Sequence, residues 1–464
     1  MGRNKDLFKN TSYVVVGSIG AKIVGFLMLP LYTRWLSPSD YGITDVIDTY
    51  ANLLMCFVAL DISDAIFIFP VGETYENIKK YYSTGFYFTL FCCILCAGVF
   101  WLLSFLNMEG GFYSNLWLIY GVLISSLFQR YTQDFCRGIK KMSVFSFTGI
   151  IQSFTIAGSS FLLVPYWGVL GFVLSCILGN CLSGFFAFIY SGSYRYLSFL
   201  KFDFGYLKSM LIYSVPLVPT GLMWWMVSGL NRPLLETYSG FFAIGLFAVA
   251  NKLPSLLNMV FGFFQKAWVV TVVEEYKKED FSAYYNKIFR VVFSMQTLLC
   301  IVITIFSKCF IHLMTTDEYY EAWIYVPILS VAVLFSNTSS FCGTIFSASR
   351  KSKYILYSVI VGGIAAVLFN FVLIPLWGLW GACIAICLSH LANSISRILF
   401  SGKMVRFTNT NYIIMQLLII GLAFGGVISE NRPLTVILIF LAFALYYLTN
   451  KALFIEIMNF VIRR

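Results

Sequence analysis

Apolar runs of eighteen or more residues recur along the whole sequence, and this recurrence constrains the fold more than any other feature. A helix needs about 20 apolar residues to cross the hydrocarbon core of a bilayer. Hydrophobic residues make up 59% of the chain and charged residues 11%, whereas a soluble domain has about 45–50% and about 25%. The sequence therefore predicts an all-α polytopic membrane protein and excludes an outer-membrane barrel, whose strands are short and alternate in polarity.

We expect fourteen spans, and the basic residues between them predict their orientation. The first run lacks a small-residue cleavage site, so we interpret it as a retained helix rather than a signal peptide. The limits of the spans are about 11–33, 42–69, 83–106, 113–135, 145–165, 168–190, 209–229, 241–265, 288–313, 322–346, 354–374, 377–396, 411–428 and 433–450.

Lys and Arg are distributed very unevenly between the two sides of these spans. With the N-terminus inside, 25 of the 32 Lys and Arg residues are cytoplasmic, three lie within spans and four are outside. The outer four are Arg34, Arg232, Lys308 and Arg432. This asymmetry follows the positive-inside rule, so we expect both termini in the cytoplasm. The net charge of +11 then reflects topology and contact with anionic membrane lipids, and predicts no nucleic-acid partner.

An internal repeat divides the chain. Residues 138–183 match residues 348–393 at a constant offset, and PYWGVLG in the first copy aligns with PLWGLWG in the second. Because the offset covers six spans, both copies have the same orientation. We therefore expect two parallel-related six-helix lobes, residues 1–200 and 201–405, followed by two further helices within 406–464. Such repeats occur in transporters that open alternately to either side. The alternative is a hairpin turn that arose twice.

Two lysines lie near the middle of expected spans, Lys22 in the first and Lys252 in the eighth. A charge at this depth costs about 2.5–3.5 kcal/mol on insertion scales, which makes each lysine a functional candidate or a paired structural residue. One lysine in each lobe predicts a cationic site between the lobes. The alternative is that each lysine pairs with a buried carboxylate and only orients helices.

Further charges are expected in the inner thirds of spans 2 and 4. Arg130, Asp134 and Arg137 are spaced along one helix face, either as an ion-pair row or with Arg130 as a substrate contact. Asp61 and Asp64 share a face of span 2. Two neighbouring carboxylates suit a proton or sodium site, and they could equally neutralise Arg130 across a helix interface.

The stretch LYTRWLSPSDYG forms the expected turn between spans 1 and 2, at the outer face. Arg34 in this turn is a candidate anion contact at the outer mouth, and we interpret Asp40 as a solvated turn residue. Asp45, Asp48 and Asn52 form a polar face at the outer end of span 2. That end is close to water, so a solvated rim is the expected role of these three residues.

The sequence contains no constellation that predicts catalysis. No P-loop and no HExxH motif occurs. Cys92, Cys93 and Cys96 form the only cysteine cluster, which lacks a second pair at zinc-site spacing and predicts helix packing. We therefore expect no enzyme activity, no metal and no cofactor, with transport driven by a proton gradient, a sodium gradient or the membrane potential.

Four stretches resemble one family of membrane proteins. They are LPLYTRWLSPSDYG at the first hairpin, SVPLVPTGLMWWMVSGLNRPLL in span 7, IGLFAVANKLPSLLNMVFGFFQKAW in span 8 and NFVLIPLWGLWGACIAICLS across spans 11 and 12. They resemble the Wzx-like polysaccharide flippases of the multidrug/oligosaccharidyl-lipid/polysaccharide exporter (MOP) superfamily. The similarity extends over nearly the whole chain.

The resemblance implies a function in surface polysaccharide biosynthesis, of the O-antigen (lipopolysaccharide) or capsule type. It implies two lobes in a V shape that carry an undecaprenyl-diphosphate-linked oligosaccharide from the cytoplasmic to the periplasmic leaflet of the bacterial inner membrane, alongside polysaccharide polymerase machinery. Lys22 and Lys252 match positions where related flippases have basic residues. The family often has Asp-Arg at the end of span 7, whereas this chain has Asn231-Arg232, so we expect Arg232 to be freer to meet an anion. The alternatives are a multidrug–cation antiporter of the same superfamily and a flippase for the peptidoglycan precursor.

Overall fold

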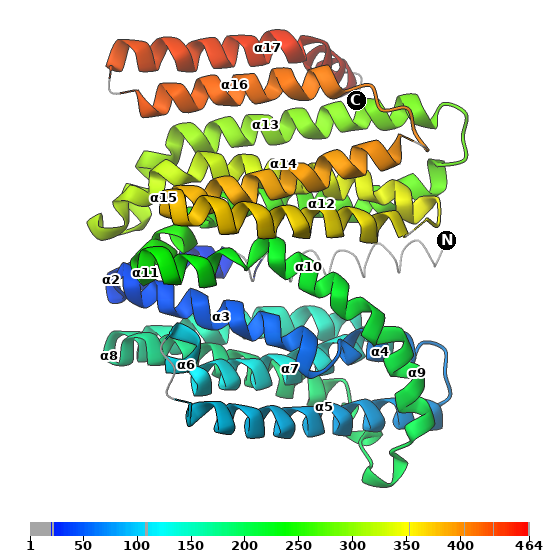
Figure 1. Cartoon of the computed structure of the whole chain (residues 1–464). Helices are drawn as coiled ribbons and strands as arrows, with labels where there is room; N and C mark the ends of the chain where they lie inside the picture. Colours follow the sequence, from blue (N-terminus) through cyan, green and yellow to red (C-terminus); the bar gives the residue numbers. More distant parts are fainter. Residues whose placement is uncertain are drawn as a thin grey trace. The chain divides into compact units, whose positions relative to one another are not determined.

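The computed structural model describes residues 20, 23–106, 110–351, 353–402, 404–429 and 431–462 (Figure 1). Within these ranges the regular structure is α-helical with short 3-10 helices, and no strand occurs. Large apolar side chains face outward along the helices, among them Leu162 at 66% and Phe371 at 56% exposure. Long helices with apolar outer surfaces fit lipid rather than water, which confirms the predicted all-α membrane fold.

The chain forms two compact units, residues 1–245 and 246–464. The described α-helices of the first unit are α2 (Leu29–Trp35), α3 (Pro38–Val58), α4 (Ile62–Ile68), α5 (Tyr75–Ser104), α6 (Gly111–Ser114), α7 (Leu116–Gly138), α8 (Met142–Tyr190), α9 (Phe204–Ser214) and α10 (Val218–Ser228). Helix α11 (Asn231–Ala250) runs across the boundary. Those of the second unit are α12 (Lys252–Glu275), α13 (Phe281–Met314), α14 (Val326–Ala348), α15 (Lys353–Ser401), α16 (Thr410–Ile428) and α17 (Arg432–Ile462). The 3-10 helices are η1 (Ser193–Tyr196), η2 (Phe199–Lys201), η3 (Val215–Leu217) and η4 (Asp317–Tyr325).

Each unit has its own apolar core. Tyr82 and Phe135 are fully buried in the first unit. In the second unit, the rings of Trp268 and Phe341 stack with centroids 5.0 Å apart. Helices α9 and α10, which we expected at the start of the second lobe, pack on α3, α4 and α5 within the first unit. The lobe limits at residues 200 and 405 stay a prediction.

The internal repeat is visible in the backbone. Helices α8 and α15 both have 49 residues, and each contains one glycine in a non-helical conformation. Gly168 has φ 51° and ψ −125°, and Gly378 has φ 53° and ψ −125°. In the turns before these helices, Lys140 and Arg350 both have positive φ, 61° and 56°. These residues pair at the same offset as the sequence repeat, so the two copies share a fold as well as a motif.

Both 49-residue helices fold back on themselves at these glycines. In α8, Gln152 Nε2 donates to Asn180 Oδ1 at 2.7 Å across 28 positions, a separation that would span about 42 Å in a straight helix. In α15, Arg397 Nε donates to Ser358 Oγ at 2.9 Å across 39 positions. Each is therefore a pair of antiparallel spans, as the sequence predicted for spans 5–6 and 11–12.

The number of spans follows from how these bent helices are counted. The described ranges hold eight helices long and apolar enough to cross a membrane, or nine when the bent pair α3 and α4 counts as one. Helices α8 and α15 each contain two expected spans, and the mostly helical stretch Phe204–Glu275 contains spans 7 and 8. The prediction of fourteen spans is consistent with these helices.

The stretch between α2 and α3 is a capped helix start. Ser37 Oγ accepts a hydrogen bond from Asp40 N, and Asp40 Oδ2 accepts one from Ser37 N, both at 3.2 Å. Pro38 occupies the first turn. This reciprocal pair is a capping box, which stabilises a helix N-terminus by about 1 kcal/mol. Asp40 therefore caps α3, a specific role that the expectation of a solvated turn residue did not include.

Close packing of α3 on α11 explains why glycine occupies positions 42 and 245, near this turn. A methyl group on Gly42 would collide with the carbonyl oxygen of Phe241, and one on Gly245 would collide with that of Pro38. The two backbones can approach this closely because neither glycine has a side chain, a common device where membrane helices cross.

Candidate functional site

A cluster of charged side chains lies where α3, α4 and α7 meet in the first unit. The guanidinium of Arg130 on α7 lies 3.5 Å from Asp61 Oδ1 and 3.2 Å from Asp64 Oδ1. Its Nε lies 3.7 Å from Asp134 Oδ2, while Arg137 Nη1 lies 3.1 Å from Asp134 Oδ1. The structure thus combines two arrangements that the sequence suggested separately, the ion-pair row along α7 and the neutralisation of Arg130 by span 2.

A break between α3 and α4 brings the two span-2 carboxylates to Arg130. The helices bend by 63° at this break. Leu60 and Asp61 adopt the left-handed region, with φ 48° and 51°, which non-glycine residues rarely occupy. Each such residue costs on the order of 1–3 kcal/mol, and strain of this kind concentrates at functional sites. We expected one continuous span 2, because no glycine or proline marks the break.

Burial differs among the three carboxylates of this cluster. The side chains of Asp61 and Asp134 are 7% and 11% exposed, whereas that of Asp64 is 43% exposed. Helix α10 covers Asp61, because a methyl group on Gly221 would lie 3.7 Å from Asp61 Oδ2. The guanidinium of Arg137 lies 4.0 Å from the centre of the Phe67 ring. The charges are therefore held between packed helices.

The cluster has more carboxylates than guanidinium groups. Three aspartates face Arg130 and Arg137, which leaves one negative charge in excess when every group is ionised. Asp61 and Asp134 are buried while Asp64 is 43% exposed, so part of this excess faces solvent. A net negative cluster suits a proton or a small cation better than an anion. The described residues contain no group of three or more His, Cys, Asp or Glu placed to hold a metal ion.

A second ion pair lies at the expected outer end of span 2. Arg232 Nε donates to Asp45 Oδ2 at 2.9 Å, and the two side chains are 11% and 25% exposed. Arg232 Nη1 also donates to Asn231 Oδ1 at 2.9 Å. Asp45 on α3 thus supplies the carboxylate that is missing beside Arg232. The interpretation of Asp45 as part of a solvated rim is wrong, and Arg232 is paired rather than free for an anion.

The remaining predicted site residues are not brought together. Arg34 is exposed in the last turn of α2 and makes no ion pair with the described residues. Lys252 is partly buried at the start of α12, directly after a one-residue interruption at Asn251. Lys22 lies outside the described residues. The roles assigned to Arg34, Lys252 and Lys22 stay predictions.

Arg397 is a buried cation that the sequence did not reveal. We placed it in a cytoplasmic segment after span 12, but it is helical and only 4% exposed. Its Nε donates to Ser358 Oγ at 2.9 Å and its Nη1 donates to the carbonyl oxygen of Ser339 at 2.8 Å. No carboxylate among the described residues lies within ion-pair distance. Arg397 therefore links the two antiparallel segments of α15 to each other and to α14. The sequence signal for its burial was that the helical pattern continues past residue 396.

Comparison with known sequences identifies relatives of the chain. The family described as polysaccharide biosynthesis protein matches residues 7–270. The capsular polysaccharide biosynthesis protein CapF of Staphylococcus aureus is 22% identical over 84% of this chain and 98% of its own length. An uncharacterized membrane protein of Methanocaldococcus jannaschii is 21% identical over 83% of this chain and 95% of its own length.

Solved structures share the fold at low identity. The lipid II flippase MurJ in an inward closed conformation has a TM-score of 0.74 at 12% identity, covering 96% of this chain and 99% of that chain. An outward-facing multidrug resistance transporter of the MATE family and MOP superfamily has a TM-score of 0.55 at 13% identity, covering 86% and 95%. At this identity the likeness shows the fold alone. The family match covers more than half of the chain, and the chain therefore belongs to the polysaccharide biosynthesis protein family.

Proposed function

We propose that this protein flips undecaprenyl-diphosphate-linked oligosaccharide repeat units from the cytoplasmic to the periplasmic leaflet of the bacterial inner membrane. The products would serve surface polysaccharide synthesis of the O-antigen or capsule type, in partnership with polysaccharide polymerase machinery. The observation that carries this proposal is the family match over residues 7–270, supported by the near full-length similarity to a capsular polysaccharide biosynthesis protein.

In this proposal Lys22 and Lys252 bind the diphosphate at mid-membrane depth. Charge-assisted hydrogen bonds from lysine to phosphate oxygens offset the desolvation of the head group. With the cell interior negative, outward movement of each negative charge is favoured by about 2.3 kcal/mol per 100 mV. The membrane potential thus drives the anionic head group outward, while the lipid tail stays in the bilayer.

We assign ion coupling to the cluster around Arg130. The support is the single carboxylate in excess of the guanidinium groups and the strained break that holds Asp61 there. When Asp61 takes up a proton, it no longer contributes negative charge to Arg130. Helices α4 and α7 would then lose part of the attraction that holds them together, which gives a proton a means to bias the conformation of the first unit.

A deletion strain with its lipid-linked intermediates analysed leaflet by leaflet tests the proposal. We expect complete repeat units to accumulate on the cytoplasmic side while growth continues. Loss of viability with accumulated peptidoglycan precursor would identify a peptidoglycan-precursor flippase instead. Drug sensitivity with normal surface polysaccharide would identify a multidrug antiporter.

Substitution of the mid-membrane lysines tests the diphosphate site. Lys22→Ala or Lys252→Ala should lower surface polysaccharide by about tenfold or more, the effect of losing one charged hydrogen bond. Lys266→Ala is the matched control, because Lys266 is an exposed lysine on the same helix as Lys252. Membrane insertion is checked by immunoblot. Normal polysaccharide in both test variants would rule out this site.

A further inference from the structure

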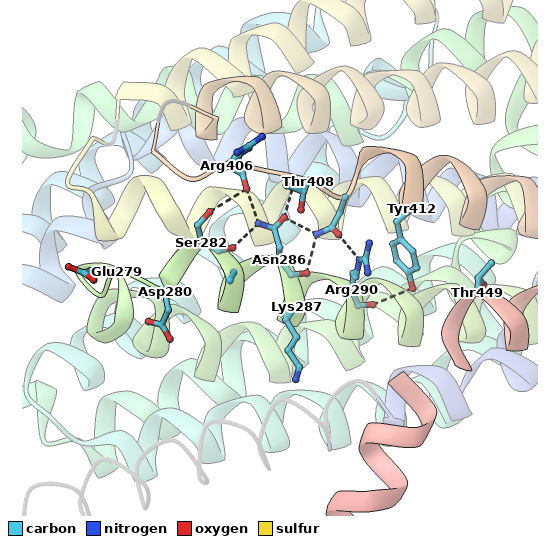
Figure 2. Close-up of a pocket in the computed structure, with 12 residues that line it drawn as sticks. Glu279, Asp280, Ser282, Asn286, Lys287, Arg290, Arg406, Thr408, Tyr412 and Thr449 are labelled. Carbon is cyan, nitrogen blue, oxygen red and sulfur yellow. Dashed lines mark hydrogen bonds between the residues drawn. The ribbon is translucent and has the colours of Figure 1, made fainter. Parts of the chain in front are cut away.

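A cavity of about 710 Å³ opens in the second unit, and no candidate residue named above is among its lining residues (Figure 2). It is lined by α13, by the segment that leads into α16, and by Thr449 of α17. The lining residues include Lys287, Arg290 and Arg406 as cations and Glu279 and Asp280 as anions. The volume is in the usual range for small-molecule sites.

Two of the helices that line the cavity place it near the boundary between membrane and water. It is formed by the N-terminal turns of α13 and α16, with Thr449 of α17 beside them. The apolar helices Phe281–Met314 and Thr410–Ile428 both begin at this level, which places the cavity near head-group depth. In the predicted orientation this is the cytoplasmic face. The N-termini of α13 and α16 also bring the positive ends of two helix dipoles to it.

Arg290 is held in place on the cavity wall. Its Nε donates to Asn409 Oδ1 at 2.8 Å. The Asn409 amide is 1% exposed, and its Nδ2 donates to Asn286 Oδ1 at 2.9 Å. Figure 2 shows this chain of bonds and the ring of Tyr412 beside the guanidinium, whose centre lies 5.3 Å from the ring centroid. A buried amide pair thus fixes an exposed cation at the cavity.

The same guanidinium is not neutralised. Unlike Arg130 and Arg232, Arg290 forms no ion pair with a carboxylate in the part of the chain that the structure describes. The carboxylates lining the cavity lie at its other end (Figure 2). Ten helical positions separate Asp280 from Arg290, about 15 Å along the axis, which exceeds the screening length of about 8–10 Å at physiological salt. The end of the cavity at Arg290 is therefore positive.

We propose that this cavity binds the phosphodiester head group of an anionic membrane phospholipid, with Arg290 as the phosphate ligand. The planar guanidinium presents Nη donors suited to two phosphate oxygens. Basic pockets between membrane helices bind anionic head groups in this way. The inference does not depend on the proposed transport function, because it uses only the second unit and its placement in the bilayer.

Binding of short-chain phosphatidylglycerol to the purified full-length protein in neutral detergent tests this site. We expect Arg290→Gln to weaken binding about fivefold and Arg290→Lys to weaken it less, since the charge remains. Arg350→Gln is the matched control, because Arg350 is exposed in the same unit and also forms no ion pair with the described residues. Thermal unfolding verifies that the variants are folded.

Three results would overturn the proposal. The first is equal binding by Arg290→Gln and the unaltered protein, or equal weakening by Arg350→Gln. The second is equal binding of phosphatidylcholine, which would show that the site does not select negative charge. The third is displacement of the lipid by inorganic phosphate at matched concentration, which would identify free phosphate as the occupant.

Discussion

The charged side chains of this protein differ mainly in whether a carboxylate reaches them. Arg130 and Arg232 are paired, Arg397 is buried against neutral oxygens, and Arg34 and Arg290 make no ion pair with the described residues. Sequence spacing revealed the pairs that lie on one helix, such as Arg130 with Asp134. It could not reveal Asp45 with Arg232, because those residues are 187 positions apart.

Substitution of Asp61 tests the coupling role of the Arg130 cluster. Asp61→Asn leaves two carboxylates facing two guanidinium groups, so the charge excess disappears. We expect flipping in proteoliposomes to continue but to lose its acceleration by a pH gradient. Asp203→Asn is the control, because it removes one carboxylate charge of the same unit from an ion pair outside the cluster, with Lys80. An unchanged response to the gradient in Asp61→Asn would contradict the coupling role.

At the scale of helices, the architecture depends on where the backbone departs from regular geometry. Gly168 and Gly378 reverse α8 and α15 with nearly identical dihedral angles. The repeated motif around these glycines, PYWGVLG and PLWGLWG, predicted both hairpins. The break between α3 and α4 occurs at Leu60 and Asp61 instead. No glycine or proline marks it, and the ion pair of Asp61 with Arg130 is among the tertiary contacts that hold it.

The α3–α11 crossing gives a prediction about stability. Gly42→Ala should lower the midpoint of thermal unfolding by several degrees, because the added methyl group meets the backbone carbonyl oxygen of Phe241. Gly98→Ala on α5 is the control, since a methyl group there has no atom within 4 Å. Alanine at an open helical position should be neutral or stabilising. Equal midpoints for Gly42→Ala and Gly98→Ala would show that the crossing is looser than described.

At the scale of the molecule, the repeat and the distribution of basic residues together predict membrane orientation. Positions separated by the repeat offset should lie on the same side in both copies. Tyr166 and Leu376 lie at the two hairpin turns and are 84% and 67% exposed. Lys140 and Arg350 lie in the two basic turns.

Cysteine labelling in intact cells tests this orientation. In a cysteine-free background, Tyr166→Cys and Leu376→Cys should react with a membrane-impermeant thiol reagent. Lys140→Cys and Arg350→Cys should react only after the cells are opened. The physical reason is the positive-inside rule, which keeps the basic turns in the cytoplasm. Opposite labelling of the two hairpin turns would exclude parallel copies.

The sequence alone determined the fold class, the helical hairpins and the family. Bilayer thickness and the cost of buried charge act on local composition, so apolar runs, basic turns and a repeated motif are readable along the chain. Only the tertiary structure decided the partners of Arg232, Arg290 and Arg397, because those partners are 187, 119 and 39 positions away in the sequence. It also decided where span 2 breaks, since packing rather than residue type holds Asp61 against Arg130.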